Sequence, residues 1–166
     1  MDWFVVNAHE ARWLDNEKFG AYTRFEPEGE RFEQVGINIS VLQPGQPMAL
    51  YHGEEDQEDF LVLSGAATLL IEGEERTLRQ WDFVHCPPWT EHIIVGAGEE
   101  PCVVLAVGGR QGEGVVYPVS ELALRHGAGA TEERRRGADG EAGKSPYIGF
   151  PEDTELTGEP DLPSLT

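Results

Sequence analysis

The segment YHGEEDQEDFLVLSGAATLLI, residues 51–71, carries the strongest signal for the fold. Its second half, residues 60–71, is largely apolar with a Ser-Gly break, and it predicts two strands around a tight bend at Ser64 and Gly65. Its first half places one histidine and five carboxylates directly before these strands. Such crowded charge indicates either a solvated acidic turn or side chains that converge on a cation.

Short strand-like segments continue on both sides of this stretch. Residues 35–42, VGINISVL, alternate branched apolar side chains with mostly small or polar ones, which is typical of a strand with one buried face. Turns are expected at 43–47 and 72–75, where Gly73 is free to adopt a positive φ. The other predicted strands are 76–81, 82–86, 91–95 and 102–107. Many short strands with little helical periodicity predict an all-β antiparallel sandwich or barrel.

Composition and charge exclude several classes of partner. The 166 residues carry 31 acids and 12 bases, a formal net charge of −19. Contacts to phosphate backbones need Lys and Arg, so we expect no nucleic acid partner and no anionic membrane surface. No apolar run approaches the roughly 20 residues of a membrane span, and the N-terminus lacks a signal-peptide pattern. We therefore predict a cytoplasmic protein whose two cysteines, Cys86 and Cys102, are buried free thiols.

The length fits a single domain with three parts. Residues 1–34 are expected to form an N-terminal extension with edge strands, and residues 35–125 a barrel whose core is 35–107. Residues 126–166 form an acidic tail, rich in Gly and Pro, which buries too little to fold alone. Its apolar side chains Tyr147, Ile148 and Phe150 could pin part of it to the barrel or to a second subunit.

Four side chains are candidates for a metal site. His52 and Glu54 lie two residues apart, so an extended chain points both to the same side. Glu58 starts the next extended segment and can lie beside His52 if the chain folds back. His92 begins another strand just after the turn at Pro87–Pro88. Converging imidazoles and carboxylates are typical ligands of divalent metals.

The spacing of these residues resembles the two signature motifs of the cupin superfamily. The first family motif runs Gly, five residues, His-x-His, three or four residues, Glu, six residues, Gly. The second runs Gly, five residues, Pro-x-Gly, two residues, His, three residues, Asn. The matching positions here are Gly45, His52, Glu54, Glu58 and Gly65, and then Trp81, Pro87, Trp89, His92 and Gly96. The chain departs from the family at Glu54, which replaces a histidine, and at Trp81 and Trp89, which replace glycines.

This resemblance implies a small double-stranded β-helix, or jelly roll, with a divalent metal. His52, Glu58 and His92 fall on three of the family's ligand positions, and the ion would be Mn, Fe, Ni or Zn. Glu54 is either the fourth ligand or a solvated acid. The turns at Trp81 and Trp89 are expected to differ from the family's turns, and Trp89 could wall the mouth of the pocket.

A further histidine lies close to these positions in the sequence. His85 alternates with Phe83, so it is a weak candidate for an acid or base facing the pocket. The alternative interpretation is a hydrogen-bonded histidine of the core.

Function follows from the resemblance only as an expectation. The leading hypothesis is a metal-dependent dioxygenase or isomerase that acts on a small organic or sugar-like molecule. The alternative is a non-catalytic cupin that binds a small ligand, with a structural metal or none. The resemblance also implies a homodimer, to which residues 3–6, WFVV, could contribute an edge strand.

Overall fold

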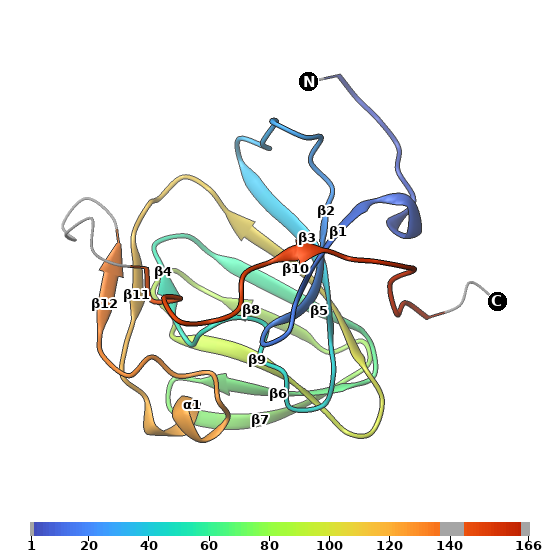
Figure 1. Cartoon of the computed structure of the whole chain (residues 1–166). Coiled ribbons are helices and arrows are strands. Elements are labelled where there is room, and N and C mark those ends of the chain that lie inside the picture. Colours follow the sequence, from blue (N-terminus) through green and yellow to red (C-terminus); the bar gives the residue numbers. More distant parts are fainter. Residues whose placement is uncertain (1, 137–144, 164–166) are drawn as a thin grey trace.

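Strands dominate the computed structural model, which describes residues 2–136 and 145–163 (Figure 1). The largest sheet has the order β13 (Thr154–Glu155), β1 (Arg12–Asn16), β2 (Gly20–Arg24), β3 (Val35–Leu42), β10 (Cys102–Gly109), β5 (Glu58–Ser64) and β8 (Phe83–Cys86). Within the described ranges, helical structure is confined to a short 3-10 turn, Ala8–Glu10, and to α1, Glu121–Arg125. The all-β prediction is thereby confirmed.

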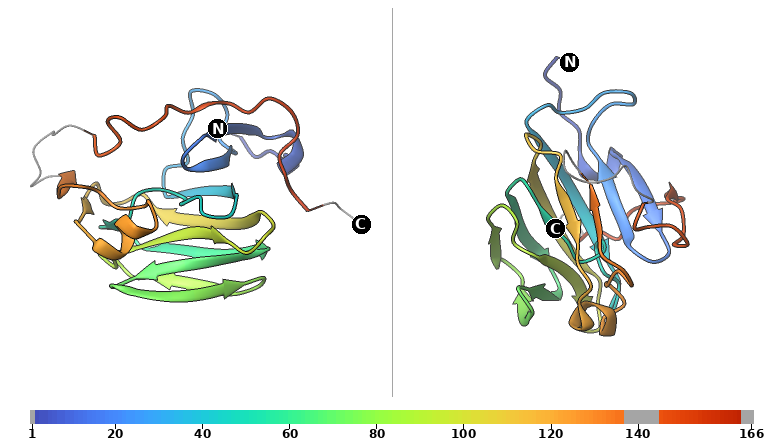
Figure 2. Two further views of the ribbon diagram at one scale, coloured as in Figure 1. Left: turned by 60° about the horizontal axis from the view of Figure 1, so that its bottom comes forward. Right: turned by 90° about the vertical axis from the view of Figure 1, so that its left-hand side faces the viewer.

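Two three-stranded sheets complete the barrel. One has the order β7 (Glu74–Arg79), β6 (Ala66–Ile71) and β9 (His92–Ala97), and the other β12 (Arg134–Arg136), β11 (Val115–Tyr117) and β4 (Gly53–Glu54). Figure 2 shows the strands lying in stacked layers. The main core lies between the large sheet and the β7-β6-β9 sheet, and its central side chains include Leu42, Val62, Leu69, Ile94 and Val104. Burial of alternate side chains from both sheets holds the layers together.

The turns expected from the sequence are present. Strand β3 spans residues 35–42 as predicted, and β5 and β6 meet at Gly65, whose φ is +74°. A Cβ at Gly65 would lie 2.5 Å from the carbonyl oxygen of Pro101, so only glycine fits there. Strands β6 and β7 form a hairpin through Glu72 and Gly73, which have φ values of +48° and +79°. Positive φ at both loop residues is the pattern of a type I′ turn.

The two tryptophans at family glycine positions have an unusual backbone conformation. Trp81 has a φ of +74° and Trp89 a φ of +66°, so both adopt the left-handed backbone that glycine favours. The expectation that these turns differ in detail from the family's turns stays a prediction. The tryptophans at these positions carry backbone strain that a glycine would avoid.

This strain leads to a stability prediction at Trp81, whose side chain is largely exposed. Replacing Trp81 by Gly is expected to raise the free energy of unfolding by about 1 kcal/mol, because the left-handed backbone penalises a Cβ but not glycine. Urea denaturation measures the change. The matched control is Trp3→Gly, at an exposed residue without a positive φ, which is expected to change stability by less than about 0.5 kcal/mol. A destabilised Trp81→Gly variant would contradict the argument.

The chain ends add to the large sheet. Strands β1 and β2 extend it beyond β3, and β13 from the C-terminal segment pairs with β1. That segment, red in Figure 1, crosses the molecule, and Tyr147 and Phe150 pack on the cluster around Leu50 and Tyr117. The tail is thus anchored more firmly than its composition indicated, although residues 137–144 and 164–166 lie outside the described residues.

Several expectations stay predictions. The three-part division of the chain and the homodimer are not tested by a single chain, in which residues 3–6 form no strand and Trp3 and Val5 are exposed. Within the described ranges, no helix is both long and apolar enough to cross a membrane.

Candidate metal centre

His52 and His92 lie directly opposite each other at the junction of two small sheets. The backbone N–H of each donates to the carbonyl oxygen of the other, at 3.2 and 2.8 Å, which forms an isolated antiparallel bridge. Opposed residues of such a pair place their side chains on the same face. The two rings accordingly lie 5.3 Å apart between centroids, and both residues are buried.

Hydrogen bonds fix the orientation of both imidazoles. Nδ1–H of His52 donates to the carbonyl oxygen of Leu50 at 2.6 Å, and Nδ1–H of His92 donates to that of Thr90 at 2.8 Å. A carbonyl oxygen can only accept, so Nδ1 carries the proton in both rings. The Nε2 atoms are therefore the ones presented to the centre of the site. Metal-binding histidines are commonly oriented in this way.

Glu58 brings a carboxylate to these two nitrogens. Its Oε2 lies 3.1 Å from Nε2 of His92 and 3.4 Å from Nε2 of His52. One ligand atom from each of the three residues lies within 4.8 Å of the other two. Nε2 of His92 and Oε2 of Glu58 are buried and, although close, are not aligned for a hydrogen bond with each other or with any other described group. A cation among the three would satisfy both atoms, so the donor set fits a divalent metal.

Without a cation, protons compensate the charge of the cluster. Burial lowers the pKa of His52, but the carboxylates of Glu54 and Glu58 outweigh it and raise the pKa to about 10. Burial likewise opposes the effect of Cys86 and Glu58 on His92, whose pKa rises to about 9. Burial raises the pKa of Glu58, but the two histidines outweigh it and lower the pKa to about 2. The metal-free site is thus a buried cluster of imidazolium and carboxylate.

These shifts predict how the stability of the metal-free protein depends on pH. The histidines have a raised pKa, so their contribution is complete below about pH 6.5 and is lost as pH rises towards 9 and 10. Glu58 has a lowered pKa, so its contribution is present above about pH 4.5 and is lost as pH falls towards 2. We therefore expect the metal-free protein to be most stable between about pH 4.5 and 6.5. The urea concentration at the unfolding midpoint, measured with a chelator present, should decrease when the pH is lowered below this range or raised above it.

The control for this prediction is the double variant His52→Ala/His92→Ala. It lacks both histidines whose pKa is raised, so its free energy of unfolding should change much less between pH 6.5 and 10. An equally steep decline in the variant would assign the alkaline loss of stability to other residues.

Glu54 lies beside the cluster but outside it. Its Oε1 is 3.5 Å from Nε2 of His52, yet Glu54 is not among the three residues whose ligand atoms all approach within 4.8 Å. Glu54 belongs to β4, whereas Glu58 begins β5 in the large sheet. The side chain of Glu54 is 29% exposed and lines a cavity next to the cluster. A partly exposed carboxylate in this place can bind a ligand or accept a proton.

His85 does not face the site, which corrects both interpretations of it. On β8, Val84 and Cys86 point into the core, so His85 and Phe83 point outward. The side chain of His85 is 50% exposed, and its Nδ1 lies 2.6 Å from Oδ1 of Asp59 on the neighbouring strand. His85 is therefore neither a core histidine nor an acid or base within reach of the cluster. Cys86 and Cys102 are buried free thiols, as predicted.

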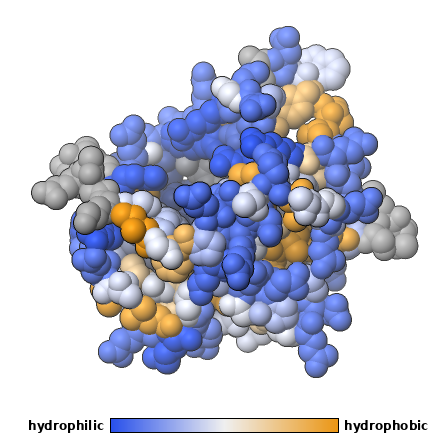
Figure 3. All heavy atoms as spheres, in the orientation of Figure 1, coloured by the Kyte–Doolittle hydropathy of each residue, from blue (hydrophilic) through white to orange (hydrophobic). Residues whose placement is uncertain are grey.

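A cavity of about 240 Å³ opens beside the cluster. Its walls include Glu54 and Glu58, the glycine-rich end of β10, Asn38 of β3, and three arginines, Arg31, Arg110 and Arg136. The face drawn in Figure 3 is hollowed near its middle, and hydrophilic residues predominate around the hollow. Trp89 does not line this cavity, although its ring covers Gly114 in the wall, where an added Cβ would lie 2.6 Å from Cη2 of the indole.

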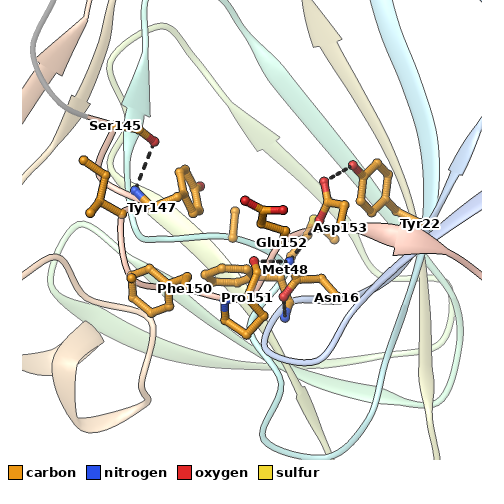
Figure 4. A pocket seen from close by; sticks show the side chains of 13 residues that line it. Asn16, Tyr22, Met48, Ser145, Tyr147, Phe150, Pro151, Glu152 and Asp153 are labelled. Carbon is orange, nitrogen blue, oxygen red and sulfur yellow. Dashed lines mark hydrogen bonds between the residues drawn. The ribbon is translucent and has the colours of Figure 1, made fainter.

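A second cavity, of about 580 Å³, lies under the C-terminal segment (Figure 4). Its walls include Phe19, Met48 and Phe150, and it contains none of the four candidate ligands. The hydroxyl of Tyr22 donates to Asp153 at 2.7 Å, and Nδ2 of Asn16 donates to the carbonyl oxygen of Pro151 at 2.9 Å. These bonds hold the segment against β1 and β2.

Sequence reasoning missed some residues around the site. The ring of Tyr117 lies 5.7 Å from that of His52, and Tyr117 in turn contacts Tyr147 of the C-terminal segment. Alternation in VVY would have placed Val115 and Tyr117 on one face, but only the pairing of β11 with β4 shows which face. The arginines of the first cavity gave no signal, since they come from three separate parts of the chain.

Comparison with known proteins agrees with this geometry. Residues 38–108, which contain β4 to β9 and most of β3 and β10 together with all four candidate ligands, match the family model described as "Cupin domain". The chain carries a cupin domain. The predicted cupin jelly roll is confirmed by this match and by solved cupin structures that are similar to the chain.

Among similar proteins, gentisate 1,2 dioxygenase 1 of Aquipseudomonas alcaligenes is 28% identical over 65 residues, which are 39% of this chain and 19% of the dioxygenase. A protein of Acidithiobacillus ferrooxidans assigned as a sugar phosphate isomerase is 33% identical, with a TM-score of 0.50 over 54% of this chain and 58% of that one. A cupin sugar phosphate isomerase of Silicibacter pomeroyi is 25% identical, with a TM-score of 0.51 over 66% and 65%. The chain thus spans less than two thirds of each.

Proposed function

We propose that His52, His92 and Glu58 hold a divalent metal ion and that the protein is a metal-dependent enzyme acting on a small, oxygen-rich molecule. The observation that carries this proposal is the buried pair of unsatisfied atoms, Nε2 of His92 and Oε2 of Glu58. Two imidazoles and one carboxylate suit Mn, Fe, Ni or Zn. A bound ion would supply Lewis-acid chemistry by polarising an oxygen of the substrate.

Isomerisation by proton transfer is the reaction that the cavity supports best. Glu54 lines the cavity beside the cluster and is not needed to complete the set of three ligands. A carboxylate in this position can take a proton from the carbon next to a carbonyl and return it to a neighbouring atom. The similarity to two sugar phosphate isomerases at 33% and 25% identity supports the same reaction class.

The experiment that tests this function surveys a set of compounds rather than a single substrate. Aldoses, ketoses and their phosphates are incubated with the protein in D₂O, and NMR follows exchange of the proton next to the carbonyl. We expect exchange with protein loaded with Mn, Fe, Ni or Zn, and its loss after chelation. Stoichiometric metal without exchange on any compound would reject the isomerase.

Dioxygenation is the second candidate, and the donor set favours it. Two histidines and one carboxylate are the ligands of non-haem iron oxygenases, and the chain resembles part of a gentisate dioxygenase. Oxygen uptake by the Fe(II)-loaded protein with gentisate tests this reaction. Ligand-induced thermal shifts without any turnover would instead support a non-catalytic ligand-binding cupin. The presence of Glu54 where the family has a histidine ligand also favours this alternative.

A further inference from the structure

The cavity beside the candidate metal centre is lined by arginines as well as by carboxylates. Three of the twelve basic residues, Arg31, Arg110 and Arg136, line it, although the chain has a net charge of −19. Guanidinium groups are the side chains that best match carboxylate and phosphate oxygens. Their presence in one small cavity calls for an explanation in terms of a ligand.

The strand pairing of the β12-β11-β4 sheet positions Arg136 at the cavity. Val115 of β11 lies opposite Arg136 on one side and opposite Glu54 on the other. Directly opposed residues point to the same face of a sheet, so Arg136, Val115 and Glu54 share one face. Val115 is buried and all three residues line the cavity. With about 4.8 Å between neighbouring strands, Arg136 lies two strands from the carboxylate that contacts His52.

Arg31 reaches the cavity from the loop between β2 and β3, and Arg110 holds this loop in place. The side chain of Arg110 forms an ion pair with Glu26 and donates from Nη1 to the carbonyl oxygen of Phe32 at 2.8 Å. Its backbone N–H donates to the carbonyl oxygen of Gln34 at 3.0 Å. Arg110 therefore has a structural partner, and it fixes the segment that presents Arg31.

Arg31 and Arg136 form no direct ion pair with the carboxylates of the cavity. Within residues 2–136 and 145–163, neither arginine has an ion pair, whereas Arg134 and Arg135 on the same strand as Arg136 each pair with a glutamate. The wall contains four acidic side chains. Glu54 and Glu58 lie beside the histidines, and Asp56 accepts the backbone N–H of Gly112. Glu113 is exposed and forms no ion pair within the described residues. Asn38 adds a polar group to the wall, and its Oδ1 accepts from Ser40 at 3.3 Å, which leaves its amide N–H groups to donate.

We propose that Arg31 and Arg136 form a binding site for an anionic group of the substrate, a carboxylate or a phosphate monoester. The inference rests on the proposed function, because it places the anionic end of a substrate whose reacting end lies towards Glu54 and Glu58. The substrate class is therefore a small hydroxy or carbonyl compound with a single anionic group.

Titration calorimetry with inorganic phosphate and with acetate tests this site. We expect the double variant Arg31→Gln/Arg136→Gln to bind the preferred anion at least tenfold more weakly than the wild type, with unchanged metal content. The matched control is Arg135→Gln, because Arg135 is exposed and paired with Glu133, and it should bind like the wild type. Tighter binding of phosphate assigns a phosphorylated substrate, and tighter binding of acetate assigns a carboxylic acid.

A third protein separates this inference from the proposed function. In His52→Ala/His92→Ala the arginines are intact, so measurable anion binding should persist even if no metal is held. Anion binding that persists in Arg31→Gln/Arg136→Gln but disappears in the histidine variant would overturn the arginine site and leave the metal centre standing. A wild-type protein without metal would reject the proposed function, and the same titrations would still decide whether the arginines bind the anion.

Discussion

Metal content is expected to fall from roughly one ion per chain to near zero when His52 and His92 are both replaced by Ala. Two of the three ligand atoms that approach within 4.8 Å are then gone, and Glu58 alone cannot hold the ion. Loss of a group that only orients a ligand weakens metal binding by about 10- to 100-fold, and loss of the ligands themselves should exceed this. Mass spectrometric metal analysis of protein purified without a histidine tag measures the effect.

The matched control for this experiment is His85→Ala. His85 is also a histidine on a barrel strand, but it points outward and pairs with Asp59, so its removal should leave the metal content unchanged. Equal metal content in the wild type and in the His52→Ala/His92→Ala variant would place the ion elsewhere. Near-zero metal in the wild type would reject the metal centre altogether.

The fold was predictable because its local signals agree with one another. The alternation over residues 35–42, the Ser64-Gly65 break and the Glu72-Gly73 hairpin each specify a strand or a turn from neighbouring residues alone. The linked spacing of His52, Glu58 and His92 then indicated the site, because the strands of a jelly roll bring these positions together. The structure places the ligand atoms of these three side chains close together.

Features that depend on pairing between distant strands were not predictable. Glu54 and Glu58 are four residues apart, yet they belong to different sheets, and only the pairing of β4 with β11 separates their environments. His85 was misplaced because Phe83, its partner in the alternation, is an apolar residue on the exposed face. Arg31 and Arg136 share a cavity although they lie far apart in the sequence, and no local pattern marks either one.

Substitution of Glu54 is expected to have a second large effect, on the rate of turnover. Replacing Glu54 by Gln is expected to leave the metal content unchanged and to slow turnover by about 10²- to 10⁴-fold, the usual contribution of a positioned acid or base. Gln keeps the size of the side chain and its place beside His52, but it cannot accept a proton. The rate of deuterium exchange on the compound found in the D₂O experiment is the measurement, with metal analysis on the same samples.

Glu99→Gln is the matched control for this substitution, because Glu99 is an exposed glutamate in the loop before β10 and should change neither quantity. The two measurements together distinguish the roles that the sequence left open for Glu54. Loss of the metal in Glu54→Gln would make Glu54 a ligand. Its carboxylate would then have to move closer to the ligand atoms of His52, Glu58 and His92 when the ion binds. Unchanged metal with unchanged turnover would make it a solvated acid, and the proton transfer would then have to use another group. Retained metal with a slowed rate is the one result that assigns Glu54 to the chemistry, because a carboxylate that only balances charge would not limit proton exchange.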